Sequence, residues 1–141
     1  MPVATRLDIA IMDRNPHVRE FLCRELAGLG HAASALPSTV SLLEALCGPN
    51  PPQVLVLDPE AAGARLTEVA KRLRDRAGQV AVVLHVFEGA DPQPGFDGAL
   101  VVEKQPDMGA LKAALASLAA QISRLSEDDD ALRLRQTRER A

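Results

Sequence analysis

The chain has 141 residues, a length that supports one ordinary domain and leaves room only for a very small second unit. Its net charge of −3 and its lack of tryptophan and tyrosine argue against nucleic-acid binding, which uses cations and aromatic stacking. No apolar run approaches the roughly 20 residues that cross a bilayer, and the first residues lack the apolar stretch of a signal peptide. We therefore expect a cytoplasmic protein that contacts neither nucleic acid nor membranes.

The first third of the chain alternates strand-like and helix-like patterns. Residues 6–12 carry branched apolar side chains and stop at Asp13, as a short buried strand would. Asn15 and Pro16 then supply a capping oxygen and a proline suited to the first helical turn, and apolar residues at steps of three and four continue to about Leu29. Residues 31–36 form a weak edge-strand candidate. This region predicts a strand, a helix and a second strand.

The middle of the chain continues the alternation. A second helix is predicted to open at Pro37–Ser38 and to close at Gly48–Pro49. Residues 53–57 form a nearly continuous apolar run, which is typical of a parallel strand covered on both faces, and this strand ends at Asp58. Apolar residues spaced for one helix face mark a third helix around 66–73, and residues 80–87 predict a fourth buried strand.

The last part departs from strict alternation. Gly89, Pro92 and Pro94 leave no room for a full helix after the fourth strand, so we expect a loop or a single helical turn there. Residues 99–102 predict a fifth strand and residues 107–125 the longest amphipathic helix. The chain is thus predicted to be an α/β domain with a doubly wound, five-stranded parallel sheet in the order 2-1-3-4-5, with its fourth helix shortened or absent.

This order makes Asp13 and Asp58 the most informative residues. Each ends a strand, and the first and third strands are neighbours at the sheet edge where such folds bind ligands. Two carboxylates at close range repel, so they require a cation, a shared proton or an arginine between them. The alternative interpretation is structural: Asp58 merely ends a strand, and Asp13 merely precedes a helix.

Three segments carry a resemblance to a known family. Residues 11–19 (IMDRNPHVR), 54–58 (VLVLD) and 82–85 (VVLH) resemble the first, third and fourth strands of response-regulator receiver domains, and the resemblance extends over 6–125. It implies that Asp58 occupies the phosphoacceptor position and Asp13 the first position of the acidic pocket. In that family the acidic residues hold Mg²⁺, and a histidine kinase or a phosphotransfer protein supplies the phosphoryl group.

Other family positions are substituted in this chain. Arg14 stands where a second acidic residue belongs, which removes a Mg²⁺ ligand and adds a permanent cation near Asp58. His85 replaces the hydroxyl residue that ends the fourth strand. The strand-five lysine is either Lys104, about two residues later than the family spacing, or is lost, with Val102 in its place. We therefore expect no bound metal and no cofactor; if Mg²⁺ binds, Asp13 and Asp58 are its ligands.

These substitutions favour a degenerate receiver, or pseudo-receiver, that regulates a partner or an output domain through protein contacts. The expected partners are a histidine kinase, a phosphotransfer protein or an output domain, and a homodimer is a further candidate. One alternative is an atypical receiver that still accepts a phosphoryl group at Asp58 and needs Mg²⁺ for it. A second is an unrelated flavodoxin-like domain. No motif for enzymatic turnover is present, so we expect no enzyme.

The tail, residues 126–141, is expected to form a separate segment after a receiver-like domain of residues 1–125. Ser126 and Asp129 have the spacing of a capping box, and Arg133 lies four residues after Asp129, as in helical ion pairs. This predicts a charged helix or a linker. It is interpreted either as a frayed, solvated end or as a signalling linker in which Leu132 and other sparse apolar residues form a two-stranded coil.

Overall fold

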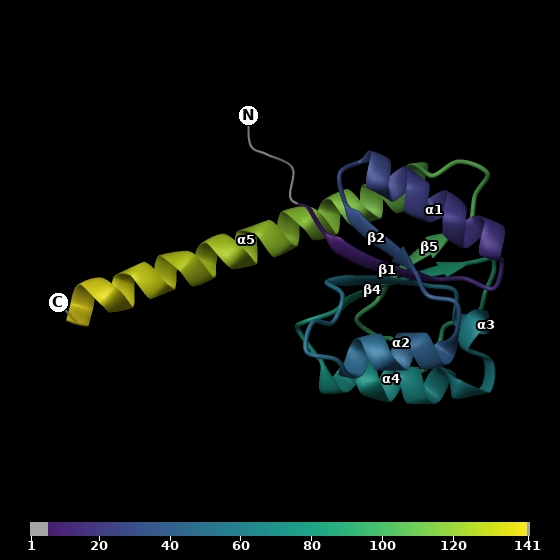
Figure 1. Cartoon of the computed structure of the whole chain (residues 1–141), viewed down its shortest axis with the longest axis horizontal. Coiled ribbons are helices and arrows are strands. Elements are labelled where there is room, and N and C mark those ends of the chain that lie inside the picture. Colours follow the sequence, from purple (N-terminus) through teal and green to yellow (C-terminus); the bar gives the residue numbers. More distant parts are fainter. Residues whose placement is uncertain (1–5, 141) are drawn as a thin grey trace.

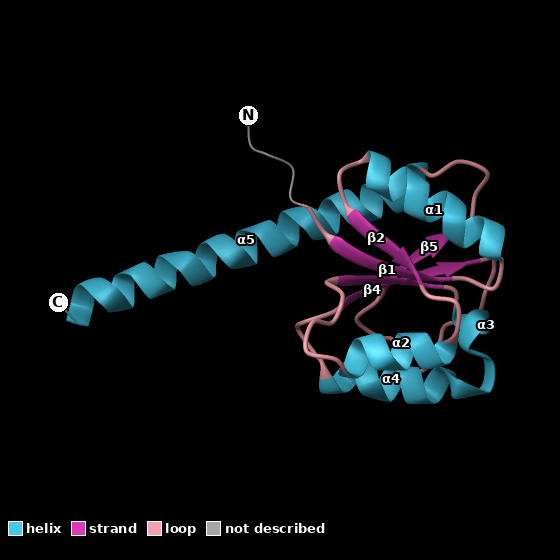
Figure 2. Ribbon diagram, in the orientation of Figure 1, coloured by secondary structure: helices cyan, strands magenta, loops and turns pink. Residues whose placement is uncertain are grey.

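In the computed structural model, the described backbone spans residues 6–140, and the described side chains leave out 126–130 and 136–140. Five parallel strands form a single sheet in the order β2-β1-β3-β4-β5, which confirms the predicted architecture (Figure 2). The strands are β1 (Asp8–Met12), β2 (Ala32–Ala35), β3 (Val54–Leu57), β4 (Ala81–Val86) and β5 (Leu100–Glu103).

Helices cover the sheet in two layers. One layer contains α1 and α5, and the opposite layer contains α2 and α4 (Figure 1). The helices are α1 (Pro16–Gly28), α2 (Thr39–Cys47), α3 (Pro59–Ala62), α4 (Leu66–Asp75) and α5 (Gly109–Arg140), with a 3-10 turn, η1 (Gly63–Arg65), between α3 and α4. Among the residues the structure describes, no helix has both the length and the apolar character needed to span a bilayer.

Each face of the sheet has its own aliphatic core, because every second side chain of a strand points to the same face. Ile9, Ile11 and Val56 pack with α1 and α5, whereas Leu55 and Leu57 pack with α2 and α4. The central strand β3 is buried along its whole length. This explains why its sequence is a continuous apolar run and not an alternating one.

Side-chain caps begin the first two helices where the sequence predicts them. The Asn15 side chain accepts a hydrogen bond from the backbone N–H of His17 at 2.9 Å, and Pro16 occupies the first helical position. The Ser38 hydroxyl accepts from the N–H of Ser41 at 3.1 Å. These caps satisfy N–H groups that lack partners within the helix, and so they help to determine where each helix begins.

No helix forms between β4 and β5, as predicted. Phe96 from this connection takes over part of the helix's role: its side chain is 8% exposed and packs into the core beside α4. The turn before it needs Gly95, whose φ is +87° and whose position would bring an added Cβ within 3.0 Å of the Ala70 Cβ. Val101 on β5, by contrast, stays 65% exposed.

Two features differ from the expectations. The short helix α3 begins directly after Asp58, where only the end of a strand was predicted. Helix α5 runs without interruption from Gly109 to Arg140, so Ser126 lies inside a helix and does not begin one. The expected capping box is therefore wrong, and no break in secondary structure separates 1–125 from the tail.

Candidate functional site

The carboxyl ends of β1 and β3 bring two aspartates together. Met12 and Leu57 are paired in register, so Asp13 and Asp58, the residues that follow them, lie side by side. The N–H of Asp58 also donates to the Met12 carbonyl at 2.8 Å. Both aspartates are only 3% exposed. Two buried carboxylates at one strand edge demand compensating positive charge.

Lys104 supplies part of that charge. Its ammonium lies 3.0 Å from Asp13 Oδ2 and 3.2 Å from Asp58 Oδ2, and its side chain is 15% exposed. It donates a hydrogen bond to Asp58, whereas the contact with Asp13 is an ion pair without hydrogen-bond alignment, since Asp13 Oδ2 has no hydrogen-bond partner among the described residues. Val102, the alternative occupant of the lysine position, packs in the core and pairs with His85 across the sheet.

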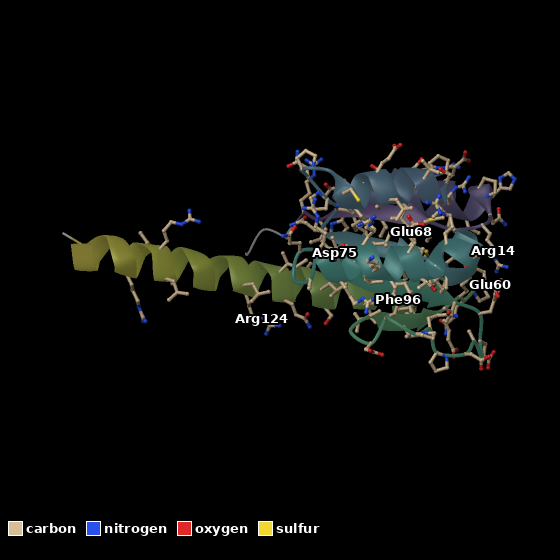
Figure 3. All side chains as sticks on the ribbon, turned by 90° about the horizontal axis from the view of Figure 1, so that it is seen from below. Arg14, Glu60, Glu68, Asp75, Phe96 and Arg124 are labelled. Atoms are coloured by element: carbon tan, nitrogen blue, oxygen red, sulfur yellow. The ribbon has the colours of Figure 1, made fainter. Side chains whose placement is uncertain are left out.

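Arg14 supplies the second cation. Its Nε donates to Asp58 Oδ2 at 2.9 Å. Its Nη1 forms an ion pair with Glu60 on α3, and these two side chains lie together in Figure 3. The hydrogen bond to Asp58 raises the pKa of Arg14. Burial alone would raise the pKa of Asp58, but the hydrogen bonds from Arg14 and Lys104 outweigh burial and bring this pKa below its ordinary value. Asp58 is therefore a carboxylate held by two cations.

The other oxygen of Asp58 has a structural role. Oδ1 accepts a hydrogen bond from the N–H of Glu60 at 3.1 Å, and Asp58 is thereby the N-cap of α3, with Pro59 at the first position. One oxygen thus caps a helix and the other accepts from two cations. An attack by Oδ2 on an electrophile would have to give up one of its hydrogen bonds, whereas Oδ1 accepts a single hydrogen bond and keeps a lone pair.

Two further side chains complete the site. His85 on β4 is 8% exposed, and its Nδ1 has no hydrogen-bond partner among the described residues. Burial lowers the pKa of His85, and the nearby ammonium of Lys104 lowers it further, against the opposing effect of Asp13 and Asp58. The Phe87 ring lies over both cations, with its centroid 4.6 Å from Lys104 Nζ and 5.3 Å from Arg14 Cζ.

Glu60 and Phe87 were not among the residues predicted from the sequence. A sequence signal existed for Glu60, because Asp58–Pro59–Glu60 has the order of an N-cap, a first-turn proline and a first-turn acid. Phe87 gave no such signal, since a single aromatic residue after a strand has no characteristic pattern. It is 57% exposed and forms the surface of the site.

The residues present do not fit a divalent cation. Mg²⁺ is usually held by one or two carboxylates, with waters completing its shell, and the two carboxylates present here already contact a guanidinium or an ammonium. The described residues contain no larger group of acidic, histidine or cysteine side chains that could hold a metal instead. The charges of Arg14 and Lys104 already balance those of Asp13 and Asp58. A metal ion would have to displace a guanidinium and an ammonium from their carboxylate partners.

No family model and no curated protein matches the sequence. Among solved structures, the response regulator TrrA of Thermotoga maritima, in complex with Mg²⁺-BeF, matches 78% of this chain and 96% of its own, with 23% identity and a TM-score of 0.66. A CheY-like receiver domain protein from Methanospirillum hungatei JF-1 matches 83% of this chain and 97% of its own, with 17% identity and a TM-score of 0.70.

Full-length FixJ from B. japonicum matches 87% of this chain and 62% of its own, with 21% identity and a TM-score of 0.73. The chain thus has the fold of response-regulator receiver domains. The resemblance predicted from three short segments is confirmed at the level of the fold.

Proposed function

We propose that the chain is a pseudo-receiver: a non-enzymatic signalling module that keeps the receiver fold and acts through protein contacts without phosphoryl transfer. One observation carries the proposal. Arg14, at the position of a metal-binding acid, is hydrogen-bonded to Asp58, at the position of the phosphoacceptor. The site thereby contains a permanent internal cation where a receiver would recruit an exchangeable one.

The physical reason lies in how phosphoryl transfer is catalysed. The reaction depends on positioning and on neutralising charge at the phosphoryl oxygens, and losing one well-placed electrostatic group costs roughly two to three orders of magnitude in rate. Here the metal ligand set is incomplete, and His85 stands in place of the hydroxyl group. A guanidinium neutralises charge but offers no open coordination position for a phosphoryl oxygen.

The proposed partner is another signalling protein. TrrA is described in complex with the histidine kinase ThkA. By analogy, we assign this chain a histidine kinase, a phosphotransfer protein or an output domain as its partner, in the cytoplasm and with no cofactor. The contact surfaces would be α1, α5 and the connection of residues 87–99, which differs from a helical crossover.

Incubation with Mg²⁺ and acetyl phosphate or beryllofluoride, followed by intact mass and NMR, tests the proposal. We expect no phosphorylated species. Arg14→Asp is expected to gain Mg²⁺ affinity before it gains phosphorylation, because His85 remains; Arg24→Asp, an exposed arginine on α1, is the matched control and should gain neither. Stoichiometric phosphorylation of the unmodified chain, abolished by Asp58→Asn, would refute the proposal.

One observation favours the alternative, an atypical receiver phosphorylated at Asp58. The ammonium of Lys104 contacts both aspartates, and the low pKa of Asp58 keeps it ionised, as a nucleophile must be. The same acetyl phosphate experiment distinguishes the two functions. We rank the alternative second because Arg14 binds Asp58 at the position of a metal-binding acid and a guanidinium cannot coordinate a phosphoryl oxygen as a metal does.

A further inference from the structure

The missing helix between β4 and β5 leaves one side of the sheet only partly covered. A groove of about 400 Å³ lies there, between the last turn of α4, the beginnings of β4 and β5, and α5. Its apolar lining includes Leu73, Ala77, Val82, Phe96, Leu100 and Leu118. Leu100 is 40% exposed, which is high for a leucine at the beginning of a sheet strand. The groove is thus an apolar docking seat close to the position of the missing helix.

Helix α5 carries exposed leucines that no described part of the chain covers. Leucines recur every seven residues along it at 111, 118, 125 and 132. The first two are 2% and 7% exposed against the sheet, whereas Leu125 and Leu132 are 64% and 55% exposed. Leu134 is 64% exposed as well. The stripe that packs on the domain therefore continues past the domain edge, where no part of the described chain covers it (Figure 1).

The sequence gives the projecting helix a charge opposite to that of the groove, with four acidic residues and one arginine, Arg133, within 125–134. Arg74 lines the groove, and Arg124 on α5 lies three residues beyond Gln121, which also lines it. Arg74 forms no ion pair with any other residue whose side chain the structure describes. The sequence of the projecting helix contains four consecutive acidic residues, 127–130, between Leu125 and Leu132. An acidic, leucine-bearing helix is the ligand that such a groove would take.

The helix cannot reach the groove of its own chain. It is continuous from Gly109 to Arg140 and leads away from the domain, as Figures 1 and 2 show. We propose that the chain forms a twofold dimer in which the projecting part of each α5, residues 125–134, docks in the groove of the other copy. The two α5 helices run antiparallel, so that each acidic run lies beside Arg74 and Arg124 of the partner copy.

The antiparallel direction follows from the position of the exposed leucines. They lie on the same stripe of α5 that contacts its own sheet at Leu111 and Leu118. In a parallel pair, both domains would have to occupy the space between the two helices. An antiparallel pair places the domains at opposite ends and joins them through two equivalent seats, which is an isologous interface.

Sedimentation velocity of the full chain over a wide concentration range tests the dimer. Leu132→Asp removes the apolar contact of the helix, and Arg74→Glu reverses the charge of the groove. Each is expected to weaken dimerisation about a hundredfold, roughly tenfold at each of the two seats. Val40→Asp, at a residue 54% exposed on α2, and Arg24→Glu on α1 are the matched controls and should leave the dimer unchanged.

A mixture of the two variants separates helix-in-groove docking from a simple coiled coil of two tails. The Arg74→Glu chain keeps an intact helix, and the Leu132→Asp chain keeps an intact groove. The mixed dimer has one intact seat and one seat with both substitutions, so at about tenfold per substitution it should be weakened about a hundredfold, like the dimer of either variant. A coiled coil of the tails alone would instead leave the Arg74→Glu dimer unweakened and the mixed dimer intermediate. The proposal does not depend on whether Asp58 accepts a phosphoryl group, and acetyl phosphate is absent from this experiment.

Three outcomes would overturn the proposal. The first is a chain that stays monomeric at every concentration. The second is a dimer that Leu132→Asp weakens but Arg74→Glu does not, which would indicate pairing of the tails alone. The third is a mixture in which the mixed dimer is as stable as the dimer of the unmodified chain. Circular dichroism of each variant verifies that the fold is intact, since both substituted side chains are exposed.

Discussion

Replacing Lys104 with methionine probes how the buried aspartates are stabilised. The ammonium lies 3.0 Å from Asp13 and 3.2 Å from Asp58, and unit charges at such distances attract by about 5 kcal/mol at an effective dielectric constant near 20. Desolvation of the ions offsets much of that attraction in the intact protein, but removing one partner alone leaves buried charge uncompensated and costs about 3–5 kcal/mol. We expect Lys104→Met to lower the free energy of unfolding by about 3 kcal/mol, the lower end of this range, because Arg14 still compensates the charge of Asp58.

Urea unfolding followed by circular dichroism measures this loss, provided that the slope with denaturant stays constant. Lys112→Met is the matched control, since this lysine forms a half-exposed ion pair with Glu25 at 3.6 Å and should contribute at most about 1 kcal/mol. Adding Asp13→Asn to Lys104→Met should recover about 1–2 kcal/mol by removing one of the repelling carboxylates. If Lys104→Met costs no more than its control and Asp13→Asn recovers nothing, the reasoning about the buried charges is wrong.

Three other predictions concern stability. The pKa of His85 lies below its ordinary value of 6.5 in the folded protein, so the unfolded chain binds this proton more strongly. The free energy of unfolding should therefore fall as the pH drops below about 6.5. Urea midpoints measured across pH should show a smaller fall for His85→Leu. Phe96→Ala should lower the free energy of unfolding by about 3–4 kcal/mol, whereas Phe21→Ala, 48% exposed, should lower it by less than about 1 kcal/mol in the same urea experiment. Gly95→Ala should lower the free energy of unfolding by about 1–2 kcal/mol, and with it the melting temperature, because φ is +87° and the new Cβ would press on Ala70. An unchanged melting temperature would contradict this.

The fold was predictable because local patterns and topology agree. The apolar run of β3, the caps at Asn15 and Ser38 and the prolines after β4 each specify their element without reference to the others. The extent of α5 was not predictable in the same way. Ser126 and Asp129 have the spacing of a helix start, but the same residues are tolerated inside a helix that has already begun at Gly109.

The site was predictable only in part. The aspartates could be brought together from strand order alone, but the contribution of Lys104 could not, because counting along the sequence from Asp97 does not reveal where β5 begins. Strand pairing shows which residue occupies the lysine position. Val102 lies opposite His85 within the sheet, so Lys104 comes just after the end of β5, on the edge that carries the aspartates. Spacing within a family pattern becomes unreliable where a loop replaces a helix.

The unbroken α5 has a mechanical consequence for the site. Its 32 residues at 1.5 Å per residue make a rod about 48 Å long, and the rod begins at Gly109, five residues after Lys104. The first turns are packed on the sheet at Leu111 and Leu118, so only the part beyond Ile122 can swing; over about 18 residues, or about 27 Å, a tilt of about 5° would carry the far end roughly 2 Å. Spin labels on Leu134 and on a residue of β2 would detect such a lever motion when the contacts of Lys104 are removed.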